Sequence, residues 1–114
     1  MNIDRIERGP VTLLRLDGDI DEEGVKALRL VLLGCIKGKR TNLVVNLSRV
    51  GVVSYMGLGV LVERLRHLRR VGGDMKLVGL NVYTKQLFRM AGVTSVFDLC
   101  DTEPHAVDTF RKAA

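Results

Sequence analysis

The residues best suited to take part in chemistry or ligand binding form the run Ser54-Tyr-Met-Gly-Leu-Gly59, which lies between two apolar segments. Ser54 and Tyr55 carry hydroxyl groups, and the two glycines allow another backbone or a ligand to come close. If a helix begins here, its free amides and positive dipole end favour an anion such as phosphate. Glycine spacing is a weak motif, however, and the same small residues would let the helix pack closely on a sheet.

Three aspartates, Asp17, Asp19 and Asp21, stand just before an apolar helical pattern. A cation site needs all three carboxylates to point the same way, which a strand end running into a turn does not provide. A turn followed by Asp21 as the N-cap of a helix is the simpler interpretation, and Glu22 and Glu23 then support the positive end of the helix dipole.

The remaining candidates for metal ligation are scattered along the chain: Cys35, His67, Cys100 and His105. Metal sites that can be recognised in a sequence show closely spaced pairs of such residues, which this sequence lacks. The sequence also contains neither a G-x-x-x-x-G-K-[ST] phosphate loop nor a G-x-S-x-G nucleophile turn. We therefore predict no metal, no cofactor and no enzymatic activity.

The segments that would position these residues alternate between strand and helix patterns. Strands are predicted at residues 3–7, 11–16, 42–47, 75–78 and 95–98, and helices at 22–37, 57–71, 82–91 and 103–112. The turn Arg8-Gly9-Pro10 pairs the first two strands as an antiparallel hairpin. Asn81 is a predicted N-cap like Asp21, and Gly38 is predicted to end the first helix in the left-handed conformation.

Apolar side chains recur at helical spacing and predict the buried face of each helix. The expected buried positions are Val25, Leu28, Leu32, Cys35, Ile36, Leu58, Leu61, Leu65, Leu68, Tyr83, Leu87 and Met90. Strand–helix–strand units require mostly parallel pairing. The fold class is therefore α/β, with a mixed, mostly parallel sheet, an N-terminal antiparallel hairpin and about four helices. Functional sites on such sheets gather where strands end, here after residues 16, 47 and 78.

Composition favours one domain over residues 1–114. Of the 114 residues, 46% are hydrophobic and 27% are charged, which excludes a disordered chain, and the length is too small for two sound cores. Two cysteines are too few for a disulfide-stapled secreted scaffold, and the first residues lack a signal-peptide pattern. No segment approaches the roughly 18 apolar residues of a membrane span. A soluble, cytoplasmic domain without a membrane span is expected.

The net charge of +5 is compatible with an acidic partner. Aromatic residues make up only 4% of the chain and Trp is absent, which argues against direct nucleic-acid binding by base stacking. Basic side chains gather in the second predicted helix: Arg64, Arg66, His67, Arg69 and Arg70. They form either a solvated face that maintains solubility or a surface that steers an acidic partner.

The order of these motifs over nearly the whole chain resembles the STAS domain, the family of bacterial anti-sigma factor antagonists. Residues 16–21, Leu-Asp-Gly-Asp-Ile-Asp, resemble the family's L-x-G-E-L-D. Residues 44–50, Val-Val-Asn-Leu-Ser-Arg-Val, resemble V-L-D-L-S-x-V, and residues 54–61, Ser-Tyr-Met-Gly-Leu-Gly-Val-Leu, resemble D-S-S-G-L-G-V-L. The resemblance implies the STAS fold and a protein-binding role.

In that family the domain binds an anti-sigma factor, often a serine kinase, until the second serine of D-S-S-G is phosphorylated. The phosphate ends binding because it adds about −1.5 to −2 charges at the contact surface. In this sequence Met56 occupies the acceptor position, after Ser54 and Tyr55, and Asn46 replaces an aspartate of the central strand. Asp21 matches a family aspartate, although it serves equally well as an N-cap. The usual phosphorylation switch is therefore predicted to be absent.

Three roles of Met56 stay open: a buried core residue, an exposed apolar anchor that binds a partner constitutively, or part of another assembly without a phosphoswitch. The start of a helix that follows a strand usually reaches the surface, which favours the last two. Ser54 is the remaining phosphoacceptor candidate, although a hydrogen bond from the helix amides to its hydroxyl explains it better.

We expect a partner to contact Asp21, Ser54, Tyr55, Met56, Gly57, Leu58, Gly59 and Leu61. The resemblance implies an anti-sigma factor antagonist-like module that sequesters an anti-sigma factor or a serine-kinase-like protein in bacterial partner switching. A homodimer stays open. The alternative is a STAS-type scaffold or an accessory subunit of a stress-signalling or lipid-transport ATPase complex.

Overall fold

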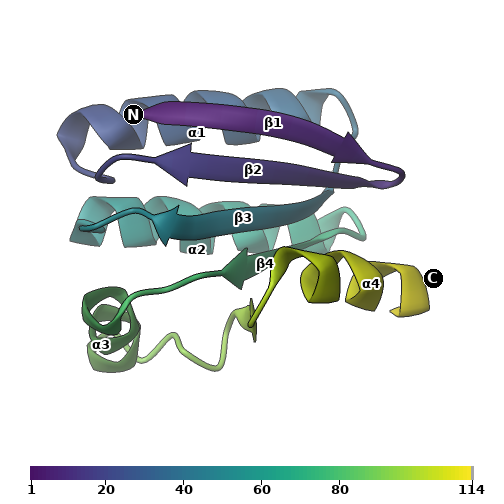
Figure 1. The fold of residues 1–114 in the computed structure, drawn as a ribbon. Helices are drawn as coiled ribbons and strands as arrows, with labels where there is room; N and C mark the ends of the chain where they lie inside the picture. The colour runs from purple at the N-terminus through teal and green to yellow at the C-terminus, as the bar shows by residue number, and fades with distance from the viewer. Residues whose placement is uncertain (114) are drawn as a thin grey trace.

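A five-stranded sheet runs through the centre of the structure (Figure 1). The computed structural model describes residues 1–113. The strands are β1 (Asn2–Arg8), β2 (Val11–Asp17), β3 (Asn42–Arg49), β4 (Asp74–Val78) and β5 (Asp98–Cys100), and they lie in the order β1-β2-β3-β4-β5. β1 pairs antiparallel with β2, and every other neighbouring pair is parallel. The predicted hairpin and mixed, mostly parallel sheet are confirmed.

Helices cover both faces of this sheet. α1 (Glu22–Lys37) and α2 (Tyr55–Arg70) lie behind it in Figure 1, α4 (Glu103–Ala113) crosses the front, and α3 (Val82–Met90) lies near the β4 side. The larger core lies under α1 and α2, and the smaller core lies under α4. β3 contributes to both cores, through Val45 to the larger and Val44 to the smaller, which explains its almost continuous apolar run.

α1 ends at Lys37 as predicted, but the left-handed residue that follows it differs from the prediction. Gly38 has φ −81°, and the left-handed residue is Lys39, with φ 59°. The amide of Arg40 donates to the Cys35 carbonyl at 2.8 Å, so the left-handed residue comes one position later than expected. The Arg40 side chain donates to Thr12 Oγ1 and to the Gly9 carbonyl, so contacts with the hairpin fix where the chain leaves the helix.

The region after β4 also differs from the prediction. Tyr83 and Met90 of α3, expected in the core, are 74% and 70% exposed, and Phe88 is buried instead. The ring of Phe88 packs against that of Phe97, with centroids 5.2 Å apart. Because Phe97 is anchored there, the last strand begins at Asp98 rather than at residue 95.

β1 is an edge strand whose side chains are mostly charged. Asp4, Arg5, Glu7 and Arg8 are all exposed. Arg5 Nε donates to Glu7 Oε1 at 2.8 Å, and Arg40 also pairs with Glu7.

Among residues 1–113, each helix is too short or too polar to cross a bilayer.

Two glycines of α1 give a matched test of this packing. A Cβ at Gly24 would lie 2.3 Å from the Asp19 carbonyl oxygen, whereas a Cβ at Gly34 meets nothing within 4 Å. We expect Gly34→Ala to raise the free energy of unfolding by about 0.5–1 kcal/mol, because alanine is the better helix former. Gly24→Ala should lower it by about 1–3 kcal/mol, because the backbone before α1 must shift. Urea unfolding of both variants measures the difference, and equal effects would contradict the close approach at Gly24.

Candidate functional site

The loop after β2 and the loop after β3 are joined by backbone hydrogen bonds around Ile20. The Ile20 amide donates to the Val52 carbonyl at 2.8 Å, and the Ser54 amide donates to the Ile20 carbonyl at 2.9 Å. These bonds form an isolated parallel bridge between Ile20 and Val53. The side chain of Ile20 is fully buried. The starts of α1 and α2 are therefore fixed relative to each other.

Gly57 sits directly on this junction. A Cβ at Gly57 would lie 2.5 Å from Ile20 Cγ2, so the helix can approach the bridge only because residue 57 has no side chain. Close packing, one of the two interpretations of the glycines, therefore accounts for Gly57. It does not account for Gly59, where an added Cβ would meet nothing within 4 Å.

Side-chain oxygens cap the three helices that begin at this end of the sheet. Asp21 Oδ1 accepts from the Gly24 amide at 2.9 Å, and Ser54 Oγ accepts from the Gly57 amide at 3.0 Å. Asn81 Oδ1 accepts from the Thr84 amide at 2.8 Å. Its Nδ2 donates to the Gly51 carbonyl at 2.9 Å, which ties the start of α3 to the loop before α2. The predicted N-caps are confirmed.

The aspartates before α1 stabilise the loops at this end of the sheet. Asp19 Oδ1 accepts from the Val52 amide at 3.0 Å, and Asp17 lies 3.7 Å from Arg49 as an ion pair. In the described part of the chain, no group of three or more His, Cys, Asp or Glu side chains is placed to hold a metal ion.

Five exposed apolar side chains gather at the starts of α2 and α3 and in the loop before α2. They are Val52 (58% exposed), Tyr55 (70%), Met56 (59%), Val82 (69%) and Tyr83 (74%). We refer to these five residues as the helix-start patch. The hydrogen bond from Asn81 to Gly51 holds the start of α3 next to the loop that leads into α2. Clustered apolar residues at an exposed loop edge are typical of a protein-binding surface.

The structure separates the residues that we expected to contact a partner. Asp21, Tyr55, Met56 and Gly59 are exposed, and Ser54 is half-buried. Leu58 and Leu61 are 4% and 0% exposed, and Gly57 is buried against Ile20. Gly57 and Leu61 belong to the face of α2 that packs on the sheet, which leaves them little or no surface for a partner, whereas Leu58 also lines a groove along α2.

Sequence reasoning missed Val52, Val82 and Tyr83. The helical spacing of Tyr83 predicts a core residue, because apolar residues at that spacing usually mark a buried face. The exposed aromatic and β-branched residues directly after Asn81, a predicted N-cap, were the available signal. A helix start after a strand end is exposed in this fold, as Met56 also shows with its 59% exposure.

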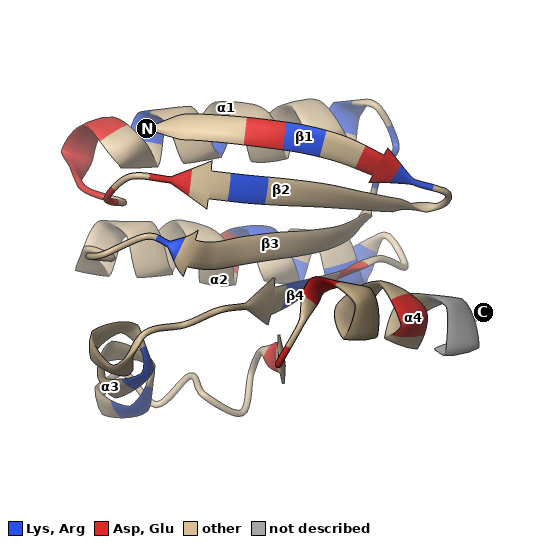
Figure 2. Cartoon of the chain, in the orientation of Figure 1, with Lys and Arg blue, Asp and Glu red and all other residues tan. Residues whose placement is uncertain are grey.

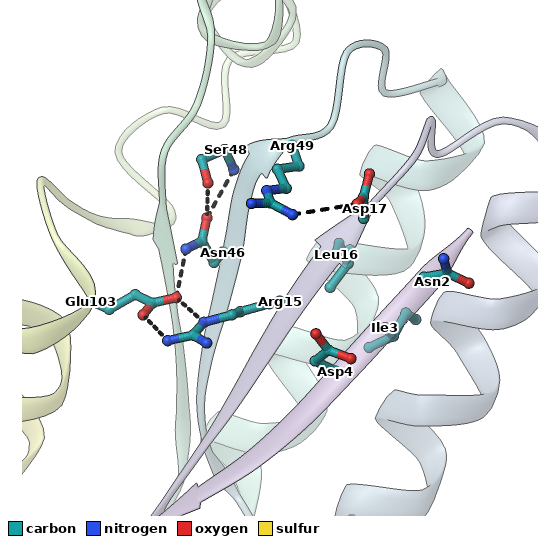
Figure 3. A pocket seen from close by; sticks show the side chains of 10 residues that line it. All are labelled: Asn2, Ile3, Asp4, Arg15, Leu16, Asp17, Asn46, Ser48, Arg49 and Glu103. Atoms are coloured by element: carbon teal, nitrogen blue, oxygen red, sulfur yellow. Dashed lines mark hydrogen bonds and ion pairs between the residues drawn. The ribbon is translucent and has the colours of Figure 1, made fainter.

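A polar hollow of about 630 Å³ lies beside α4, on the face of the sheet opposite α1 and α2 (Figure 3). Arg15 donates twice to the Glu103 carboxylate, at 2.9 Å in each case. Asn46 Nδ2 donates to Glu103 Oε2 at 2.6 Å, and Ser48 donates to Asn46 Oδ1. An aspartate at position 46 would face the Glu103 carboxylate, so the amide suits this contact. Arg15 lowers the pKa of Glu103 below its usual value, and this effect and the hydrogen bond from Asn46 outweigh the effect of partial burial.

Charge is unevenly distributed over the helices (Figure 2). The first turn of α1 carries Glu22 and Glu23, whereas the first turns of α2 and α3 carry no acidic residue. The last turn of α2 is basic, and there Arg69 pairs with Asp74 at 3.0 Å. The start of α2, which lacks an acidic residue in its first turn, therefore lies beside an apolar surface, and the basic residues lie at the other end of the helix.

A family model for the STAS domain matches residues 2–106, and the chain belongs to that family. It is 24% identical over 98 residues to the anti-sigma F factor antagonist of Paenibacillus polymyxa, covering 85% of this chain and 84% of that protein. The fold is similar to that of TM1081 from Thermotoga maritima, with a TM-score of 0.90 at 18% identity over 96% of this chain and 94% of that one. It is also similar to SpoIIAA, solved in its unphosphorylated form, with a TM-score of 0.77 at 22% identity over 96% and 98% of the two chains.

The contact between Arg15 and Glu103 predicts a pH-dependent stability. Because the pKa of Glu103 is lowered in the folded protein, the pair is fully stabilising above the unfolded value of about 4.3 and loses its effect as the pH falls through the folded value. We expect Glu103→Gln to lower the free energy of unfolding by about 1 kcal/mol at pH 7, a modest value because Arg15 is partly exposed, and by less near pH 3.

Urea unfolding at both pH values measures this difference. Asp108→Asn is the matched control, because Asp108 is an exposed residue of the same helix that forms no ion pair with any side chain of residues 1–110. An equal loss of stability at pH 7 and pH 3 in Glu103→Gln would contradict the ionic contribution.

Proposed function

We propose that the protein is an anti-sigma factor antagonist-like binding module that sequesters a serine-kinase-like anti-sigma factor in bacterial partner switching. Membership of the STAS family and the anti-sigma F factor antagonist of Paenibacillus polymyxa support this role. The observation that carries the proposal is the 59% exposure of Met56 within the helix-start patch, at the position of the family's phosphoacceptor. The module acts by binding and is not an enzyme.

The geometry of the helix-start patch suits binding at a low entropic cost. Tyr and Met are enriched in protein interfaces because they offer large apolar contact areas. The loops that carry Val52 and Tyr55 are fixed by the backbone bonds to Ile20 and by the Ser54 cap. A surface that is already ordered loses little conformational freedom when a partner docks.

The same geometry supports a module without the serine switch. SpoIIAA has been solved in a phosphorylated and an unphosphorylated form. In this chain the thioether of Met56 carries no oxygen that could accept a phosphoryl group, and Ser54 Oγ accepts the Gly57 amide at the half-buried start of α2. Binding is then constitutive, which means that it is not switched off by phosphorylation. The amounts of the two proteins decide how much anti-sigma factor is captured.

A carboxylate at position 56 tests this surface. We expect Met56→Glu to weaken binding to the anti-sigma factor by tenfold or more, because the new charge must be desolvated at the contact. Its stability should stay the same or rise, because a carboxylate in the first turn of α2 is favoured by the helix dipole. Calorimetric titration against serine-kinase-like anti-sigma factors of the same bacterium measures the affinity.

Leu30→Glu is the matched control for this titration, because Leu30 is an apolar residue of α1 that is 71% exposed and lies outside the helix-start patch. We expect it to bind like the wild-type protein. A wild-type protein that binds none of the anti-sigma factors and elutes as a large homo-assembly would overturn the proposal in favour of the scaffold alternative.

Incubation with the kinase and ATP tests the missing switch. We expect mass spectrometry to detect no phosphate on the peptide that contains residues 54–61, because the kinase must place the acceptor oxygen accurately and Met56 has none. A Met56→Ser variant, which restores the hydroxyl, is the positive control. Phosphorylation of Ser54 or Tyr55 in the wild-type protein would contradict this part of the proposal.

A further inference from the structure

A groove runs along α2, next to the helix-start patch. Its volume is about 450 Å³, and its lining includes Tyr55, Leu58, Gly59, Val62, Arg66 and Val93. All of these except Val93 belong to α2, and Val93 lies in the segment between α3 and β5. The floor is mostly apolar, and basic groups stand toward the C-terminal end of the helix. The groove has both apolar surface and charge, so it can select a partner segment.

Gly59 lies in this groove and has no packing role within the chain. Glycine in the interior of a helix is less favourable than alanine by roughly 1 kcal/mol. At Gly57 close contact with Ile20 explains that cost, but an added Cβ at Gly59 would meet nothing within 4 Å. The open space above Gly59 fits the close approach of a second backbone.

Two arginines supply the charge of the groove. Arg66 and Arg70 are one helical turn apart, both are exposed, and neither forms an ion pair with another residue of the described chain. Arg69, their neighbour, differs because it pairs with Asp74 at 3.0 Å. Glu63 is the one acidic residue that lines the groove. The charge at this end therefore fits a partner segment that carries carboxylates.

We infer that the groove receives an acidic amphipathic helix of the anti-sigma factor, an inference that rests on the proposed function. From Tyr55 to Arg70 the α2 backbone extends about 22 Å, enough to lie along some 15 residues of a partner helix. The partner helix places a small residue over Gly59 and an apolar stripe on Val62 and Val93. Its carboxylates pair with Arg66 and Arg70. The helix-start patch and the groove together form one continuous contact surface.

Two variants of the full chain test the groove in titrations with the anti-sigma factor. We expect Gly59→Leu to lower the affinity at least tenfold, because the side chain occupies the space above the helix. Its melting temperature should stay the same or rise, since leucine is the better helix former. We expect Arg66→Glu/Arg70→Glu to slow association at least tenfold at low salt and to reduce its salt dependence. The control Arg29→Glu/Lys37→Glu makes the same charge change at two exposed cations of α1 and should associate less than threefold more slowly.

A photo-crosslinking residue at Val62 identifies the segment that occupies the groove. We expect crosslinks to a helical segment of the anti-sigma factor with acidic residues three or four apart. Crosslinks to a basic or non-helical segment would overturn the inference. Wild-type affinity of Gly59→Leu, while Met56→Glu still impairs binding, would overturn the groove and leave the proposed function standing. Absence of binding by the wild-type protein would overturn both.

Discussion

The backbone junction at Ile20 is the constraint on which the binding surface depends. Ile20 donates to the Val52 carbonyl and accepts from the Ser54 amide, while Gly57 packs on its side chain. The junction therefore joins two strand–helix connections that are far apart in the sequence. Met56 and Tyr55 stay exposed because the residues on either side of them are held against the sheet. The surface is rigid because its supports are buried, although its own side chains have few contacts.

The elements of the fold could be predicted wherever local rules decide them. Asp21, Ser54 and Asn81 cap their helices through their own side chains, which is a property of a few neighbouring residues. The leucine stripe of α2 was also visible as a pattern. The left-handed residue after α1 was not predictable in this way, because Arg40 is anchored to Thr12 and the hairpin. Which face of α3 is buried depends similarly on a residue outside the helix, because Phe88 packs against Phe97.

The residues of the candidate site likewise include some that local sequence rules predict and others that depend on the packing of distant elements. The exposure of Met56 follows from its place at a helix start, which the sequence indicated. Gly57 and Gly59 are the same residue type two positions apart, yet only Gly57 touches another element. Tyr83 has the spacing of a core residue, and only the position of α3 relative to the sheet exposes it. Sequence patterns show which residues could be buried, and the packing of elements decides which of them are.

The charged rim of β1 has a consequence for how this chain meets other chains. An incoming strand that added to the free edge would have to strip water from Asp4, Arg5, Glu7 and Arg8 and disturb the contact between Arg5 and Glu7. Sheet extension is thereby discouraged, even when the chain is concentrated. Encounters with neighbours are directed instead to the end of the sheet where α2 and α3 begin, because uncharged apolar side chains are exposed there.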